Sequence, residues 1–593
     1  MPGFHFPLSV PRRAATRCAQ LASAAVIALP AALHAAPAAE PVPAAVPAPA
    51  TVPSAAPLRN TVVTTADGAV RGVVRHGALE FRGMPYAAAP VGRLRFAAPQ
   101  PAAPWQGVFD ATRFGAPCAQ PQRYRLTAAS DAEDCLRINV SVPADAAPDQ
   151  KLPVLVWVHG GAFVGGGAEL YRLDRLATRG RLVVVSFNYR LGVFGWMPHP
   201  ALPRADNGGW ALEDQRAALR WVQRNIAAFG GDPQRVTLAG ESAGAFAVCA
   251  HLSAPERVAG LFQRAILSSA ACLQPLPTLD DALRGPHPMW RRIGDALGCL
   301  HEPDASLRCL RAQPTAALVG AQQRVSHDLL DFAPVVGNAT LPRTGAEALA
   351  SGRVMRVPLL AGGTRDELRL YVAYDLLQSP RPPGFDAAAL RRYWLPRYYG
   401  ADHDGRFGAI LAEYAPHSTL GGGEFGSMLS DYNPKIGLNN CLYQASDAAF
   451  VRWVPELYAF EYADADAPVL GVGIAPGLDP GIALGAVHAS DLSALFPHFS
   501  NTAANDGPDL APASQRLADA MLLAWAAFAH GAGPAAPGLP AWPRYRNAGD
   551  VMLLQPDRSQ VYDAAAAHRC AFWQRLYPDL RRREDAPQKP EKS

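Results

Sequence analysis

Two stretches in the first half of the chain are apolar at almost every position, not at alternate positions. They read LPVLVWV (residues 152–158) and LVVVSF (residues 182–187). Runs of this length predict strands that are buried on both faces, as in a parallel sheet covered by helices. Residues 61–74 predict a hairpin, with Asp67-Gly68 at its turn.

Helical segments alternate with further strands along the chain. Residues 210–230 predict a helix that ends at Gly230-Gly231, and short apolar runs at 235–240 and 262–270 predict two more strands. This alternation predicts the α/β class, with a large, mostly parallel central sheet and helices on both faces. The proline-rich stretches 280–345 and 380–447 are less regular and predict helical insertions over the sheet.

Composition excludes one broad class of function. The 593 residues are 49% hydrophobic, which is enough for a large core. The 55 Lys and Arg residues nearly balance the 51 Asp and Glu residues, for a formal net charge of +4. We find no basic stripe with interleaved aromatic residues, so no nucleic-acid partner is expected.

The N-terminus has the features of a secretory signal. The basic stretch PRRAATR (residues 11–17) precedes a short apolar stretch at 18–33, and small residues follow near Ala35. An uncleaved membrane anchor is the alternative, but the apolar stretch is short and is interrupted by Pro30. We therefore predict export to the periplasm or the cell exterior, and no later segment resembles a membrane span.

The signal and the composition divide the chain into four parts. These are a signal peptide (1–35), an Ala/Pro-rich disordered linker (36–58), one large domain (59–580) and a charged flexible tail (581–593).

Eight of the nine cysteines lie outside the signal. An even number in an exported chain predicts disulfides, although spacing does not fix their pairing. No CxxC pair or Cys/His cluster occurs, so we expect no metal site.

The segment Gly240-Glu241-Ser242-Ala243-Gly244 fits the pattern G-x-S-x-G. It lies between a predicted strand and a predicted helix, which is the context of a nucleophile on a sharp turn. Small flanking residues allow that turn, and the turn exposes the serine hydroxyl to a substrate. The backbone N–H of Ala243 would then face the carbonyl oxygen under attack.

A second glycine-rich segment, HGGAFVGGG (residues 159–167), directly follows the strand at 152–158. The backbone N–H groups of Gly161 and Ala162 would complete an oxyanion hole with that of Ala243. A phosphate-binding loop is the alternative. The chain lacks both the G-x-x-x-x-G-K-[ST] pattern and a dinucleotide fingerprint at its first strand, which disfavours it.

Further motifs accompany these two segments. They include FRGMPYAAAPVGRLRFAAPQP, EDCLRINV, NYRLGVFGW and CAFWQRLYP. Together they resemble the type-B carboxylesterase family of α/β hydrolases, which includes cholinesterases and bacterial para-nitrobenzyl esterases, over residues 61–578. The resemblance implies an α/β-hydrolase fold with helical insertions over the active site. It also implies an exported serine carboxylesterase that forms an acyl-enzyme and needs no cofactor.

The resemblance supplies the partners of Ser242. The segment VPLLAGGTRDELRLYV resembles the family's acid segment and aligns Glu367 with the acid, while GAVHASDLSALF aligns His488 with the base. Asp366 is the alternative acid, because Leu368 stands where the family has glycine. Glu241 is expected to support the site.

The family's disulfides imply three pairs here: Cys118–Cys135, Cys299–Cys309 and Cys441–Cys570. Cys249 and Cys272 remain, and either a fourth disulfide or two buried thiols would fit them.

The substrate class is less defined. The loop between Cys118 and Cys135 lacks the tryptophan with which cholinesterases bind quaternary ammonium groups, so acetylcholine is not expected. The predicted partner is a small-molecule ester, with a specialised feruloyl, lipid or toxin ester as the alternative. A non-catalytic binding or adhesion protein on the same fold is disfavoured, because such relatives typically lose triad members.

Overall fold

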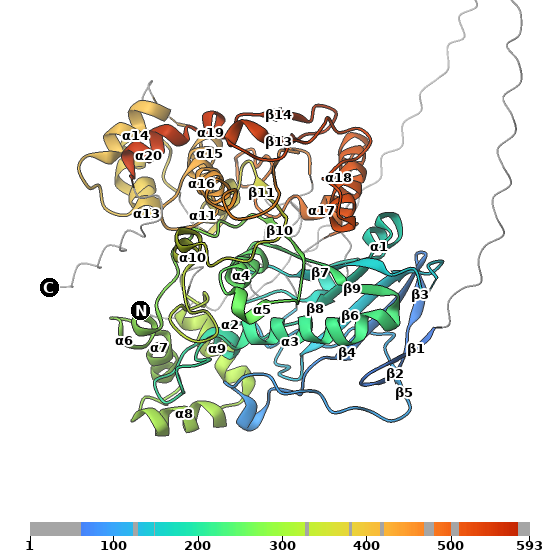
Figure 1. Cartoon of the computed structure of the whole chain (residues 1–593). Coiled ribbons are helices and arrows are strands. Elements are labelled where there is room, and N and C mark those ends of the chain that lie inside the picture. The colour runs from blue at the N-terminus through green and yellow to red at the C-terminus, as the bar shows by residue number, and fades with distance from the viewer. Residues whose placement is uncertain are drawn as a thin grey trace, which may run out of the picture. The chain divides into compact units, whose positions relative to one another are not determined.

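A mixed sheet of eleven strands forms the centre of the protein (Figure 1). The computed structural model describes residues 61–121, 128–147, 149–326, 331–378, 382–415, 420–467, 479–499 and 509–578. The predicted signal, linker and tail lie outside these described residues. In spatial order the strands are β14 (Gln560–Tyr562), β13 (Val551–Leu554), β12 (Leu457–Tyr462), β11 (Leu359–Thr364), β10 (Arg264–Ser268), β9 (Gly231–Glu241), β7 (Leu152–Val158), β8 (Val183–Phe187), β6 (Arg137–Pro143), β4 (Ala78–Pro85) and β3 (Val73–Arg75).

The strands from β13 to β8 in this order are parallel, and the outer strands β14, β6, β4 and β3 pair antiparallel. The predicted α/β class with a large, mostly parallel sheet is therefore confirmed. The two apolar runs form β7 and β8, and every residue of both strands is buried. Both of their faces are covered, as their composition predicts.

The predicted hairpin is present, with its turn displaced by one residue. Strand β1 (Val62–Thr65) pairs antiparallel with β2 (Gly68–Arg71), so the turn is Ala66-Asp67 and Gly68 begins the second strand. Strand β5 (Val108–Asp110) joins them in a separate three-stranded sheet. Gly68 has a φ of 141°, a conformation that glycine adopts readily.

Side chains of β7 alternate between two cores, one on each face of the sheet. Val154 and Val156 lie in the core that includes α3 (Trp210–Asn225) and α4 (Ala243–Leu252). Leu155 and Trp157 lie in the other core, with α1 (Asp174–Gly180) and α18 (Pro512–His530). This alternation follows from the two-residue period of a strand.

The two irregular stretches form two groups of helices (Figure 1). The first group contains α6 (Leu279–Arg284), α7 (Met289–Ala296), α8 (Pro303–Ala312) and α9 (Thr315–Val325). The second contains α12 (Ala387–Ala389), α13 (Leu395–Tyr399), α14 (Arg406–Tyr414), α15 (Gly422–Asp431) and α16 (Asn440–Phe450), and it packs with α20 (Cys570–Leu576) around a third core. The remaining α-helices of the described residues are α2 (Gly192–Trp196), α5 (Pro255–Val258), α10 (Gly345–Ser351), α11 (Arg369–Gln378), α17 (Leu492–Leu495) and α19 (Ala564–Ala567).

Four disulfides link the described cysteines. The pairs are Cys118–Cys135, Cys249–Cys272, Cys299–Cys309 and Cys441–Cys570. The pairing that the sequence left open is thus a fourth disulfide, which joins α4 to the segment after β10. Disulfides of this number are typical of proteins in oxidising compartments.

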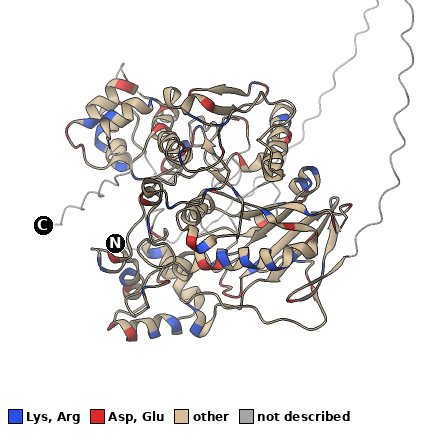
Figure 2. Cartoon of the chain, in the orientation of Figure 1, with Lys and Arg blue, Asp and Glu red and all other residues tan. Residues whose placement is uncertain are grey.

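Charged residues of both signs are interspersed over the helices (Figure 2), in agreement with the small formal net charge. In the part of the chain that the structure describes, no helix is both long and apolar enough to span a membrane.

Candidate active site

Ser242 lies in a sharp turn between β9 and α4. Its φ of 56° and ψ of −127° are unusual for a residue with a side chain, and such strain is frequent at functional sites. A Cβ on Gly240 would lie 2.6 Å from the carbonyl carbon of Gly244, and one on Gly244 would overlap the carbonyl oxygen of Val158. The two glycines therefore let the strand, the turn and the helix approach closely enough to present the serine.

Three side chains form a continuous hydrogen-bonded chain. The Oγ of Ser242 lies 2.8 Å from Nε2 of His488, and Nδ1 of His488 lies 2.6 Å from Oε2 of Glu367. Ser242 follows β9 and Glu367 follows β11, at the carboxyl ends of parallel strands, where ligands bind in open α/β sheets. The arrangement can transfer a proton from the serine hydroxyl to the imidazole.

Glu367 is fully buried and well supplied with donors. Its Oε1 accepts hydrogen bonds from the backbone N–H of Thr364 and the hydroxyl of Tyr443, both at 3.0 Å. Burial raises the pKa of this carboxyl, but the charge and the hydrogen bond of His488, together with further hydrogen bonds such as that from Thr364, hold the pKa below its usual value. Glu367 is therefore ionised and can orient the imidazole.

Two more carboxyl groups surround His488. Burial raises the pKa of Glu241 to about 8, and its Oε1 lies 3.4 Å from Nε2 of His488. Burial also raises the pKa of Asp491 to about 6, and its Oδ2 accepts a 2.5 Å hydrogen bond from Ser268. Burial lowers the pKa of His488, but Glu367 and Glu241 together raise it to about 9. The site thus favours the imidazolium that forms when Ser242 attacks.

The glycine-rich segment after β7 turns sharply toward Ser242. Gly161, Ala162 and Phe163 all have positive φ values, of 118°, 53° and 62°. Among the described residues, none accepts a hydrogen bond from the backbone N–H of Gly161, Ala162 or Ala243. Unpaired N–H groups at such a turn are suited to bind a developing oxyanion.

The glycine-rich segment is held from both sides. The ring of His159 stacks on Tyr189 at 4.4 Å between centroids, and the Tyr189 hydroxyl donates to the carbonyl oxygen of His159. Burial lowers the pKa of His159 to about 4, so this histidine is neutral. The side chain of Gln120 pairs with both backbone groups of Gly166 at 2.8 Å. Gln120 lies in the loop closed by Cys118–Cys135, so that disulfide supports the segment.

Asp366, the alternative acid, does not contact the imidazole. Its carboxylate instead contacts Arg365, Arg369 and the backbone N–H of Ala486. Leu368, which stands where the family has glycine, is fully buried in the third core. The leucine therefore does not displace Glu367 from His488.

Sequence reasoning missed several groups at this site. Tyr443, Ser268, Asp491 and Gln120 all make contacts described above, yet none lies in a motif that indicates its role. Asp491 follows His488 by only three residues, so an acidic residue just after the base was the one available signal.

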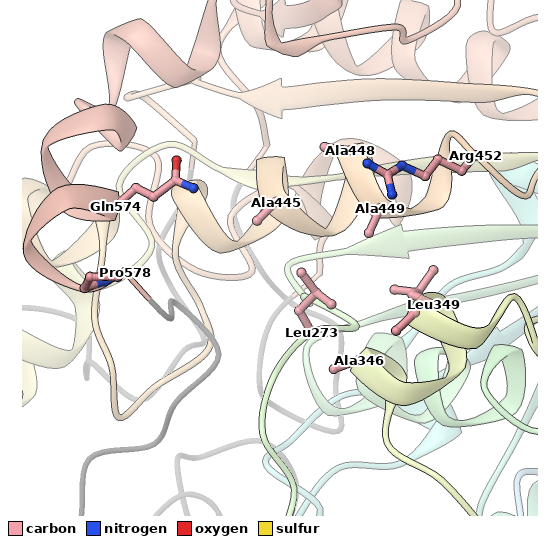
Figure 3. Close-up of a pocket in the computed structure, with 10 residues that line it drawn as sticks. Leu273, Ala346, Leu349, Ala445, Ala448, Ala449, Arg452, Gln574 and Pro578 are labelled. Carbon is pink, nitrogen blue, oxygen red and sulfur yellow. The ribbon is translucent and has the colours of Figure 1, made fainter.

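No group of three or more His, Cys, Asp or Glu side chains is placed to hold a metal ion within the described residues. A cavity of about 450 Å³ lies between α10, α16 and α20 and is lined mostly by alanine and leucine (Figure 3). Arg452 and Gln574 are the only polar side chains among the described residues that line it, and no described residue of the Ser242 site does so.

Comparison with known proteins agrees with this geometry. The model of the Carboxylesterase family matches residues 59–573. The chain belongs to this family. It is 38% identical over 325 residues to the para-nitrobenzyl esterase of Bacillus subtilis (strain 168), a match that spans 54% of this chain and 65% of that protein. It is 32% identical over 509 residues to the fumonisin B1 esterase of Sphingopyxis macrogoltabida, across 83% of this chain and 85% of that protein.

A solved structure of a Geobacillus stearothermophilus carboxylesterase superposes on this carboxylesterase with a TM-score of 0.71 and 32% identity. The match covers 87% of this chain and 100% of that chain. The α/β-hydrolase fold and the predicted carboxylic ester hydrolase are confirmed by the family and these relatives.

Proposed function

We propose that this carboxylesterase acts through Ser242 as nucleophile, His488 as general base and Glu367 as the acid that orients the base. The observation that carries the proposal is the unbroken chain of contacts, 2.6 Å from Glu367 to His488 and 2.8 Å from His488 to Ser242. Glu367 is ionised, and the imidazole of His488 lies within hydrogen-bond distance of both Glu367 and the serine hydroxyl whose proton it must accept.

The reaction proceeds in two acyl transfers. His488 removes the proton from Ser242, whose Oγ attacks the ester carbonyl, while the N–H groups of Gly161, Ala162 and Ala243 bind the oxyanion. His488 then protonates the departing alcohol. Water, deprotonated by the same imidazole, releases the acid and regenerates the serine. Glu241 supports the imidazolium through its own carboxyl group.

The substrate is a small-molecule carboxylic ester. One relative is a fumonisin B1 esterase and another is a pyrethroid hydrolase from Mus musculus, so the family contains specialised members. A specialised feruloyl, lipid or toxin ester is therefore the second candidate here, with the same mechanism. A binding or adhesion role alone would not require the strained serine and its two partners.

We also propose that the protein is exported. Its parts are a signal peptide at 1–35, a linker at 36–58, the hydrolase domain at 59–580 and a tail at 581–593. Four disulfides support an oxidising compartment. The intact mass of the protein recovered from the periplasm or medium tests this: a mass that retains residues 1–35 would contradict it.

Hydrolysis of para-nitrophenyl acetate and butyrate tests the nucleophile. Ser242→Ala is expected to lower kcat by about 10⁶-fold, because the attacking oxygen is lost. Ser351→Ala is the control, since that exposed hydroxyl on α10 bonds only to its own helix among the described residues. Equal turnover by the wild type and Ser242→Ala would refute the assignment. If the wild type is inactive on both esters, a narrow specialised substrate becomes the leading candidate.

A further inference from the structure

Two short segments carry the partners of Ser242. The acid turn, residues 365–369, contains Glu367, and the histidine loop, residues 483–488, ends at His488. The backbone N–H of Asp366 donates to the carbonyl oxygen of Ala486 at 2.9 Å, and the N–H of Ala486 donates to Oδ2 of Asp366 at 3.1 Å. Asp366 thus binds both backbone groups of one residue in the histidine loop.

The carboxylate of Asp366 is itself firmly held. It is 2% exposed, and its Oδ2 accepts from Nη2 of Arg365 at 3.1 Å. Its Oδ1 lies 3.1 Å from Nη2 of Arg369, whose Nη1 donates to the carbonyl oxygen of Ala483. Both arginines therefore fix the carboxylate, and one of them also contacts the histidine loop.

The histidine loop is shaped to receive this carboxylate. Gly485 has a φ of 68°, and a Cβ at this position would overlap Oδ2 of Asp366. One step further along, the N–H of His488 donates to the carbonyl oxygen of Glu367 at 3.4 Å. The acid turn therefore contacts the histidine loop at residues 483, 486 and 488.

We propose that Asp366 is a positioning residue, which clamps the backbone of the histidine loop to the acid turn so that His488 stays in register with Glu367 and Ser242. The two neighbouring acids have separate roles, since Glu367 orients the imidazole ring and Asp366 holds the loop that carries it. A displacement of about 1 Å at a reacting group costs on the order of 10²-fold in rate, so such a clamp affects turnover directly.

The test compares Asp366→Ala, Asp366→Asn and Asp375→Ala. Asp375 is the matched control, because it lies on α11, pairs with Arg397 and Tyr398, and has no polar contact with the described residues of the histidine loop. Active-site titration with a para-nitrophenyl phosphate triester counts competent sites, so kcat is expressed per site. We expect Asp366→Ala to lower kcat on para-nitrophenyl acetate by about 10–100-fold with little change in KM. Asp366→Asn should lie closer to the wild type, because its amide oxygen can still accept from Ala486.

A second readout separates positioning from stability. His488 faces three carboxyl groups, those of Glu367, Glu241 and Asp491, and contact with Glu367 raises its pKa. When the loop loosens, this contact weakens. The acidic limb of the kcat/KM profile should therefore move to lower pH in Asp366→Ala and stay in place in Asp375→Ala. Hydrogen exchange at the Ala486 amide should accelerate in the same variant.

Three results would overturn the clamp. These are an Asp366→Ala enzyme with unchanged kcat per titrated site and unchanged pH limb, an Asn variant as impaired as the Ala variant, and unchanged exchange at Ala486. The inference rests on the proposed function. The proposed function is refuted if the wild type neither hydrolyses the ester nor reacts with the phosphate triester. The clamp is refuted if the wild type and Asp366→Ala have the same kcat per titrated site.

Discussion

Two buried histidines in this carboxylesterase each lie against two carboxyl groups, yet only one of them is arranged to act as a base. His488 contacts Glu367 through Nδ1, and its Nε2 faces both Ser242 and, at 3.4 Å, Glu241. His568 lies between α19 and α20, with Nδ1 2.7 Å from Asp431 and Nε2 2.6 Å from Glu461.

The pKa of both rings is raised, but the chemical consequences differ. Burial lowers the pKa of His568, and its two carboxylates more than reverse this and raise it to about 10. With a carboxyl acceptor on each nitrogen, this ring remains an imidazolium and has no free nitrogen lone pair. At His488 the short contact of Nε2 is with a hydroxyl, which can give up a proton. A neutral partner on one nitrogen is thus the feature that distinguishes a catalytic base from a structural cation.

The two clusters also differ in what surrounds them. Asp431 accepts a further hydrogen bond from Tyr414 at 2.6 Å, and Cys570, two residues after His568, is bonded to Cys441. His568 therefore connects the C-terminal helices to α15 and β12. Around His488 the contacts converge on Ser242 instead, beside the glycine-rich segment whose N–H groups can bind an oxyanion.

The largest difference between the two histidines is expected in turnover. His488→Gln should lower kcat on para-nitrophenyl butyrate by about 10⁵–10⁶-fold, because no base remains to activate Ser242. His568→Gln should keep kcat per titrated site within a few-fold of the wild type, because this ring contacts none of the reacting groups. A comparable loss of turnover per site in both variants would show that the two clusters are not separate in function.

The next difference is expected in stability. His568→Gln leaves Glu461 buried without the cation that it contacts, and leaves Asp431 with the more distant Arg569, whose Nη1 lies 3.6 Å from Oδ2. The free energy of unfolding should therefore fall by about 3–5 kcal/mol at pH 6. The folded pKa of about 10 lies above the ordinary histidine value of 6.5, so this stabilisation is fully present below pH 6.5 and is lost as pH rises through 10.

Urea unfolding at pH 6 and pH 10, with the disulfides intact, measures the gap between the wild type and His568→Gln. The gap should be wide at pH 6 and narrow at pH 10. A gap of the same size at both pH values would mean that the charge on the imidazole does not contribute to the free energy of unfolding.

A contrast between contiguous motifs and contacts of distant residues explains what could be predicted from the sequence. Ser242 and the glycine-rich segment are local signals, because each directly follows a strand and its glycines are adjacent in sequence, so their chemistry is visible in a few residues. Glu367 and His488 were placed by family motifs. Burial on both faces of β7 and β8 was visible in their unbroken apolar composition.

Contacts between distant segments could not be predicted. Asp431 and Glu461 lie 137 and 107 residues from His568, and nothing in their neighbourhood indicates a shared ion cluster. Tyr443 reaches Glu367 across 76 residues. Such partners are selected by tertiary packing, which leaves no periodic or motif signal in the chain.

The smallest expected effect concerns the second carboxyl at each histidine. Glu241 raises the pKa of His488, so Glu241→Gln should lower that pKa. A neutral imidazole, which is the active base, then persists to lower pH. The acidic limb of kcat/KM, which reports ionisations of the free enzyme, should therefore shift to lower pH. Glu461→Gln is the matched control at the other histidine: it should destabilise the fold and leave this limb in place. A limb that is unmoved by Glu241→Gln would mean that Glu367 alone sets the basicity of His488.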